Sequence, residues 1–147
     1  MEKLTIEHLS PYLPYGLKIK HNKTNDIFVI DGVLSFSDRI VCSELGKLNE
    51  IDLPLVKPIL RPLSFLSDSE LINIGLMLRE IEIGKETSND RVFAIKDAFY
   101  FLSKMKSTLS LNQSQRITTY LFSIKADVFG LIEKGLAIPV TNELNPY

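Results

Sequence analysis

Residues 17–30 read LKIKHNKTNDIFVI, and this stretch decides the fold. Apolar and polar residues alternate over its first part, so that one side of an extended chain is apolar and the other carries Lys18 and Lys20. Residues 22–26 form a polar turn, and residues 27–30 are apolar on both faces. The stretch therefore predicts a hairpin whose second strand is more deeply covered than its first.

Further strands are expected in the first third of the chain, because a lone hairpin is only marginally stable. Asp31-Gly32 is a turn signal, after which residues 33–36 and 39–42 offer one or two more short strands. Three prolines spaced by four exclude an interior helix between residues 53 and 63. That segment is expected to be extended or looped and to cross the surface of the core.

The second half of the chain predicts helices. Ser67 and Glu70 have the spacing of a capping box, so we expect a helix from about Asp68 to Ile83. Gly84 then supplies the left-handed residue that commonly follows a helix end.

A second amphipathic helix is expected over residues 92–105. The side chains expected to point inward share its apolar face: Val92, Ile95, Phe99, Leu102 and Met105. Residues 92–95 also fit a short strand, and this alternative stays open.

A third helix opens with residues 110–113, which fit another capping box. Its apolar residues between Ile117 and Val128 fall on one face. The helix is expected to run or kink through residues 127–134 and to stop at Gly135, with residues 136–138 folding back as an extended tail.

Together these elements predict an α+β fold, in which a small antiparallel N-terminal sheet packs against a C-terminal layer of about three helices. The chain of 147 residues has the size of a single domain. Within that domain we expect the sheet over about residues 15–63 and the helices over about residues 67–135.

The composition argues against several classes of partner. Seventeen basic and eighteen acidic side chains leave a formal net charge of -1, so the chain as a whole does not attract nucleic acid or anionic membranes. No stretch approaches the ~20 apolar residues of a membrane span, and the first residues lack the pattern of a signal peptide. Cys42 is the only cysteine, which excludes an internal disulfide. We predict a cytoplasmic protein with no membrane partner.

Three segments carry a resemblance to a known group of proteins. Residues 11–18 (PYLPYGLK), 57–64 (KPILRPLS) and 127–138 (DVFGLIEKGLAI) resemble, in the same order, segments of uncharacterised proteins encoded by phages and prophages of Bacteroides-type bacteria. Residues 68–114 match no pattern of that group. The resemblance implies a mobile element in a bacterial host, and it supplies no catalytic residues because no activity is attached to the group.

No catalytic, metal or cofactor site is indicated by the residue pattern. His8, His21 and Cys42 can each bind zinc, but they lack the close paired spacing that presents ligands together, and a lone cysteine in an apolar strand is usually a core residue. The glycines are scattered singly, which disfavours a phosphate-binding loop. We therefore expect no cofactor and lean against an enzyme.

One surface suggests nucleic-acid binding. Aromatic and basic residues that can stack on bases and neutralise phosphates recur in and around the predicted sheet: Tyr12, Tyr15, Lys18, Lys20, Lys23, Lys57 and Arg61. Alternatively the tyrosines form a lid over the core while the lysines protect a sheet edge, and the near-neutral chain favours this interpretation. Clustering of Lys18, Lys20, Lys57 and Arg61 on one face would favour nucleic acid.

The leading hypothesis from the sequence is a phage or prophage accessory protein that acts through protein contacts. The Pro-rich segment and the last helix offer apolar residues for a protein partner or for self-association. Phe122 and Phe129 lie off the main apolar stripe and are the candidates for such a surface.

Overall fold

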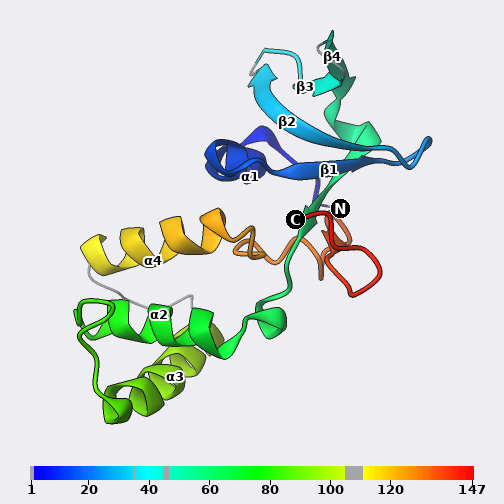
Figure 1. The fold of residues 1–147 in the computed structure, drawn as a ribbon. Coiled ribbons are helices and arrows are strands. Elements are labelled where there is room, and N and C mark those ends of the chain that lie inside the picture. Colours follow the sequence, from blue (N-terminus) through cyan, green and yellow to red (C-terminus); the bar gives the residue numbers. More distant parts are fainter. Residues whose placement is uncertain (1, 35, 45–46, 105–110) are drawn as a thin grey trace. The chain divides into compact units, whose positions relative to one another are not determined.

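The structure is a computed structural model that describes residues 2–34, 36–44, 47–104 and 111–147, with only the backbone described for residues 44, 47 and 111–114. It confirms an α+β fold with an N-terminal sheet and C-terminal helices (Figure 1). Contacts divide the chain into two compact units. Met1–Pro62 and Leu121–Tyr147 form the sheet unit, and Leu63–Tyr120 forms the helical unit. The expectation of a single domain stays a prediction.

The sheet has six strands in the order β4-β3-β2-β1-β5-β6. The strands are β1 (Lys18–His21), β2 (Ile27–Leu34), β3 (Arg39–Glu44), β4 (Lys47–Asp52), β5 (Val56–Leu60) and β6 (Ile138–Pro139). Neighbours from β4 to β5 are antiparallel and β6 is parallel to β5, so the sheet is mixed. The hairpin expected from residues 17–30 is confirmed as β1 and β2.

The prediction of a turn at Asp31-Gly32 is wrong. β2 continues through both residues, and a register shift between Ile30 and Gly32 marks a bulge against β3. The chain turns only after Leu34, whose carbonyl accepts a hydrogen bond from the Ser37 N–H at 3.2 Å. Because a bulge accommodates an extra residue within one strand, a turn signal can lie inside a continuous strand.

The Pro-rich segment is extended, as expected, but it is a strand of the sheet and does not cross its surface. A short 3-10 turn at Leu53–Leu55 leads into β5, which is paired to β1 on one side and to β6 on the other. Val56, Ile59 and Leu60 of this strand are buried. Such burial is typical of a strand that has a neighbour on each side.

The core of the sheet unit lies on one face of the sheet, called here the inner face. Buried residues there come from the strands, from α1 (Ile6–Leu9) with the 3-10 turn that follows it, and from the chain after residue 125. They include Leu9, Tyr12, Leu17, Ile19, Ile30, Ile40, Leu53, Val56, Leu60, Leu131 and Ala137. The opposite, outer face of β1 therefore carries Lys18 and Lys20.

In the helical unit, α2 (Asp68–Leu78) begins with the capping box that the sequence predicts. The Glu70 N–H donates to Ser67 Oγ at 3.3 Å, and the Ser67 N–H donates to the Glu70 carboxylate at 2.8 Å. The helix ends before the expected Ile83. Glu80 has φ +57° and is the left-handed residue here, so that the Ile81 N–H donates to the Leu76 carbonyl at 3.0 Å.

The next helix, α3 (Ser88–Ser103), starts at a capping box of Thr87 and Asp90 that the sequence interpretation missed. The strand alternative for residues 92–95 is wrong. Val92 and Phe99, expected to point inward, are 56% and 59% exposed, whereas the small Ala94 and Ala98 are buried. Met105 lies outside the described residues.

The orientation of α3 follows from a close crossing with α2. A Cβ added at Gly75 would lie 2.0 Å from the Ala94 carbonyl oxygen. Helices can approach this closely only where small residues face each other, because interaxial distance depends on the side chains at the contact. The large side chains of α3 are therefore displaced from the contact line.

The last helix, α4 (Leu111–Ser123), buries Ile117 and Leu121 as expected. It ends at Ser123 and does not continue to Gly135. Lys125 and Gly130 have φ +57° and +65°, so the chain forms turns instead of further helix. The expected capping box at residues 110–113 lies outside the described side chains. No helix in the described parts of the chain is long and apolar enough to span a membrane.

Candidate functional site

The outer face of the sheet brings lysines from two neighbouring strands together. Lys20 on β1 lies directly opposite Lys57 on β5, and opposite Ile27 of β2 on its other side. Lys18, two residues earlier on the same face, lies opposite Val29. Ile19, between the two β1 lysines, is fully buried on the inner face. The alternation seen in the sequence thus places both β1 lysines outward.

Two further cations extend this group. Arg61 follows β5, and its N–H donates to the Lys125 carbonyl at 2.8 Å. Burial, together with the nearby charges of Lys18 and Arg61, lowers the pKa of Lys125. These cations are therefore close enough to repel one another. We call the whole group the basic cluster; it consists of Lys18, Lys20, Lys57, Arg61 and Lys125.

The Tyr147 ring contacts two lysines at one end of the basic cluster. The ammonium groups of Lys18 and Lys125 lie 5.7 Å and 5.1 Å from its ring centroid. Its hydroxyl accepts from the Lys18 N–H at 3.0 Å and donates to the Ile59 carbonyl at 2.8 Å, and its partial burial raises its pKa to about 12. The Lys18 ammonium also donates to the Pro146 carbonyl. Nothing near Tyr147 in the sequence signals this position.

The lysines of the basic cluster have no acidic partner within the described part of the chain. The ion pairs found there involve other cations, such as Arg39 with Glu50 and Asp52 at the far side of the sheet. Like charges directly opposite each other in a sheet are destabilising. The pairing of Lys20 with Lys57 therefore costs stability, and a bound polyanion would remove that cost.

Two of the aromatic residues singled out from the sequence lie elsewhere. Tyr12 has no exposed surface, and its hydroxyl donates to the Ala126 carbonyl at 2.7 Å and accepts from the Val128 N–H at 3.3 Å. Its burial raises its pKa. Tyr12 therefore cannot stack on a base. Tyr15 is half-buried at the end of the 3-10 turn after α1.

Phe122 and Phe129 pack on Tyr12. Their ring centroids lie 4.8 Å and 6.4 Å from the Tyr12 ring, both with edge-on geometry. Both are half-buried and belong to the rim of the core. They do not form the exposed apolar surface that the sequence interpretation expected, because the turns after α4 fold them back onto the sheet unit.

The residues considered for metal binding are engaged locally. His8 and His21 each accept a backbone N–H through Nδ1, from Thr5 at 3.1 Å and Thr24 at 3.2 Å. Cys42 is buried in β3. Among the described residues, no group of three or more His, Cys, Asp and Glu side chains is placed to hold a metal ion.

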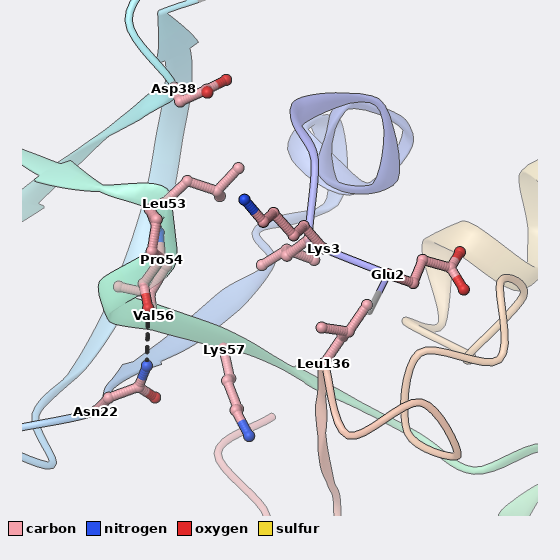
Figure 2. A pocket seen from close by; sticks show the side chains of 10 residues that line it. Glu2, Lys3, Asn22, Asp38, Leu53, Pro54, Val56, Lys57 and Leu136 are labelled. Carbon is pink, nitrogen blue, oxygen red and sulfur yellow. Dashed lines mark hydrogen bonds between the residues drawn. The ribbon is translucent and has the colours of Figure 1, made fainter.

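The sheet unit also contains a pocket of about 450 Å³ beside the start of β5 (Figure 2). Its lining combines apolar and polar residues: Glu2, Lys3, Leu4, Asn22, Asp38, Leu53, Pro54, Val56, Lys57 and Leu136. Glu2 and Asp38 lie on opposite sides of it, and the Asn22 amide donates to the Pro54 carbonyl at 3.2 Å. The two carboxylates thus do not form an acid and base pair around a common point.

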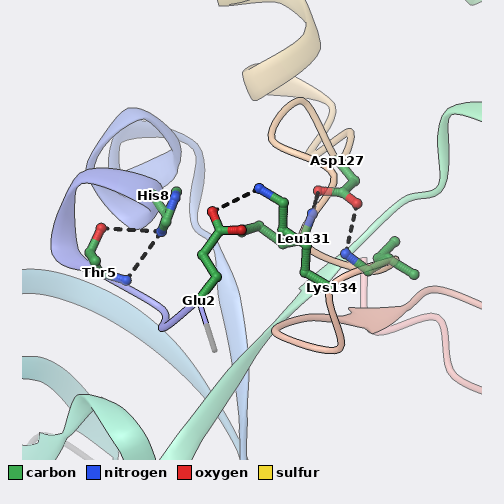
Figure 3. Close-up of polar contacts among 7 residues, drawn as sticks. Glu2, Thr5, His8, Asp127, Leu131 and Lys134 are labelled. Atoms are coloured by element: carbon green, nitrogen blue, oxygen red, sulfur yellow. Dashed lines mark hydrogen bonds and ion pairs between the residues drawn. The ribbon is translucent and has the colours of Figure 1, made fainter.

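The segment after α4, which carries Lys125, is held by one buried carboxylate (Figure 3). Asp127 is 7% exposed and accepts the N–H groups of Leu131 and Ile132 at 2.8 Å and 2.9 Å. Nearby, Lys134 pairs with Glu2 at 2.9 Å. Asp127 therefore fixes the turn formed by residues 127–132.

Comparisons with protein-family models, with curated proteins and with solved structures found no match to this chain. The functional argument therefore rests on the chemistry of the surfaces. Of these, the basic cluster contains a like-charge pair, Lys20 and Lys57, for which the described part of the chain shows no acidic partner.

Proposed function

We propose that the sheet unit binds nucleic acid, with the basic cluster neutralising backbone phosphates. The observation that carries the proposal is the placement of Lys20 opposite Lys57, without an acidic partner for either lysine in the described part of the chain. Pairs of like charges that destabilise the fold are typical of functional sites, because a bound ligand of opposite charge can compensate the repulsion.

The near-neutral net charge led the sequence interpretation away from nucleic acid, but affinity depends on local charge. Lys18, Lys20 and Lys57 lie on one face, and Arg61 lies near Lys125 beside them, which is the arrangement that favours nucleic acid over scattered surface lysines. The resemblance of three segments to phage and prophage proteins supports a mobile-element context in the cytoplasm of a bacterial host, and this context is part of the proposal.

The test is fluorescence anisotropy with a labelled oligonucleotide across a range of salt concentrations. Five phosphate contacts predict a slope of log K against log salt of about -3.5 for a single strand. The double substitution Lys20→Gln with Lys57→Gln should reduce the magnitude of that slope by about 1.4. A matched control, Lys85→Gln with Lys96→Gln, makes the same change in net charge within the helical unit and should leave the slope unchanged.

Two results would overturn the proposal. One is the absence of binding at low salt. The other is an equal loss of affinity in the control variant, because that would show that net charge acts and that the basic cluster does not.

A second candidate function, protein contact, is favoured by the surface of α3. Four large side chains are exposed there by about half or more: Val92, Phe93, Phe99 and Tyr100. Three cations lie over their rings: Arg79 and Lys96 at 5.2 Å and 6.0 Å from the Phe93 centroid, and Lys104 at 4.8 Å from the Tyr100 centroid. Apolar patches with a polar rim mark interaction sites in proteins.

Self-association is the form of this candidate that can be measured without a known partner. Light scattering coupled to size-exclusion chromatography should show a discrete oligomer for the natural chain and a monomer for Phe99→Ser with Tyr100→Ser. Phe122→Ser serves as the comparison, because Phe122 packs on Tyr12 and should change stability but not assembly. A monomeric natural chain at all concentrations removes self-association from consideration.

A further inference from the structure

The spacing of the lysines on β1 suits an extended single strand. Side chains two residues apart on a strand are ~6.7 Å apart along it. This is close to the separation of successive phosphates in an extended single-stranded nucleic acid. Lys18 and Lys20 can therefore each meet one phosphate of consecutive nucleotides, while Lys57 adds a second charge beside Lys20.

The neighbouring strand offers one exposed aliphatic side chain for each lysine. Val29 lies opposite Lys18 and Ile27 lies opposite Lys20. These side chains are 37% and 41% exposed, although both belong to an interior strand of the sheet. Charge on β1 and β5 thus borders directly on apolar surface on β2.

An uncharged row continues beyond β2. Val29 lies opposite Ser43 of β3, and Ser43 lies opposite Leu48 of β4, which is 74% exposed. No residue in this row carries a charge. On the outer face, the cations of β1 and β5 therefore border an uncharged row on β2, and the charges farther along β3 and β4 are paired, Arg39 with Glu50 and Asp52.

We propose that this face binds single-stranded nucleic acid along β1, with phosphates at Lys18, Lys20 and Lys57 and bases resting on Val29 and Ile27. The inference rests on the proposed function and names its substrate class. In a duplex the faces of the bases are stacked on one another, so apolar surface on a sheet cannot reach them. Single strands present those faces, and proteins that bind them combine a basic groove with side chains that contact the bases, which are aliphatic side chains here.

The experiment compares three labelled probes of equal length by fluorescence anisotropy at fixed salt. They are a single-stranded oligothymidylate, an abasic single strand with the same phosphates, and a duplex. The oligothymidylate should bind about tenfold more tightly than the abasic strand, because only the former has bases to contact. It should also bind more tightly than the duplex.

Two variants separate the role of the aliphatic side chains on β2 from that of the lysines on β1 and β5. Ile27→Thr with Val29→Thr keeps β-branched side chains at exposed positions, and it should reduce oligothymidylate affinity to that of the abasic strand while leaving abasic binding unchanged. Lys20→Gln with Lys57→Gln should weaken the binding of both single strands equally.

The outcomes distinguish the inference from the proposed function. Equal affinity for oligothymidylate and the abasic strand, or preference for the duplex, overturns the single-strand inference and leaves phosphate binding standing. Failure of all three probes to bind overturns the proposed function itself. Loss of abasic binding in the threonine variant would also contradict the inference, because those side chains would then support the lysines and not the bases.

Discussion

The contact of Gly75 on α2 with Ala94 on α3 predicts that Gly75→Ala destabilises the protein. The added Cβ would lie 2.0 Å from the Ala94 carbonyl oxygen and 2.4 Å from the carbonyl carbon and Cα of the same residue. Ordinary contact begins at 3.4 Å, so the two helices must move apart by about 1.4 Å. The contacts are with backbone atoms, which cannot rotate away.

The size of the effect follows from two opposing terms. Forcing an extra methyl group into a packed contact costs ~1–3 kcal/mol, and a backbone contact puts this case at the upper end. Alanine gains ~1 kcal/mol over glycine in a helix interior. We therefore expect a net loss of about 2 kcal/mol in the free energy of unfolding.

Urea unfolding followed by far-ultraviolet circular dichroism measures this loss. The control is Gly32→Ala, where a Cβ meets nothing within 4 Å, and its free energy of unfolding should change by less than ~0.5 kcal/mol. The double variant Gly75→Ala with Ala94→Gly should not recover stability, because glycine keeps the carbonyl and Cα atoms that the new methyl group strikes.

Either of two results would refute the close crossing. One is a Gly75→Ala variant as stable as the natural chain. The other is recovery of stability by Ala94→Gly, which would show that side chains, and not backbones, meet at this point.

Three further predictions concern the sheet unit. Lys20→Gln should raise the free energy of unfolding by about 0.2–1 kcal/mol in urea, because it removes the repulsion with Lys57; a loss would mean that an unseen partner compensates the pair. Asp127→Ala should lower the free energy of unfolding by roughly 2–4 kcal/mol, since one buried and one partly buried N–H group lose their acceptor; an unchanged urea midpoint would contradict the role of Asp127 in holding the turn. The pKa of Tyr147 is raised to about 12, so the unfolded chain ionises first and stability should hold below about pH 10 and fall above it. Tyr147→Phe should flatten that fall in urea midpoints measured against pH, and an identical profile would show that Tyr147 does not cause it.

The sequence predicted local structure correctly where the interactions that cause it join residues only a few positions apart. The alternation around Lys18 and Lys20 predicted β1 and the outward direction of its lysines. The capping box at Ser67 and Glu70 predicted the start of α2, because both hydrogen bonds join residues three apart. The prolines of residues 53–63 predicted an extended backbone for the same local reason.

Errors arose where a local signal was overridden by a distant contact. Asp31-Gly32 is a turn signal, but pairing with β3 keeps β2 extended through it. Val92 and Phe99 have the spacing of a buried stripe, yet α3 presents Ala94 to Gly75 instead. Helical spacing defines which residues share a face, and it does not define which face meets a neighbour.

The candidate site shows the same division. The sequence by itself determined the composition of the lysine strand, its period of two and the net charge of -1. Only the tertiary structure decided that Lys57 lies opposite Lys20, that Tyr147 lies beside Lys18, and that Tyr12 is buried. The physical reason is that strand pairing and burial join residues far apart in the chain, and such contacts depend on the packing of the whole unit and not on any short pattern.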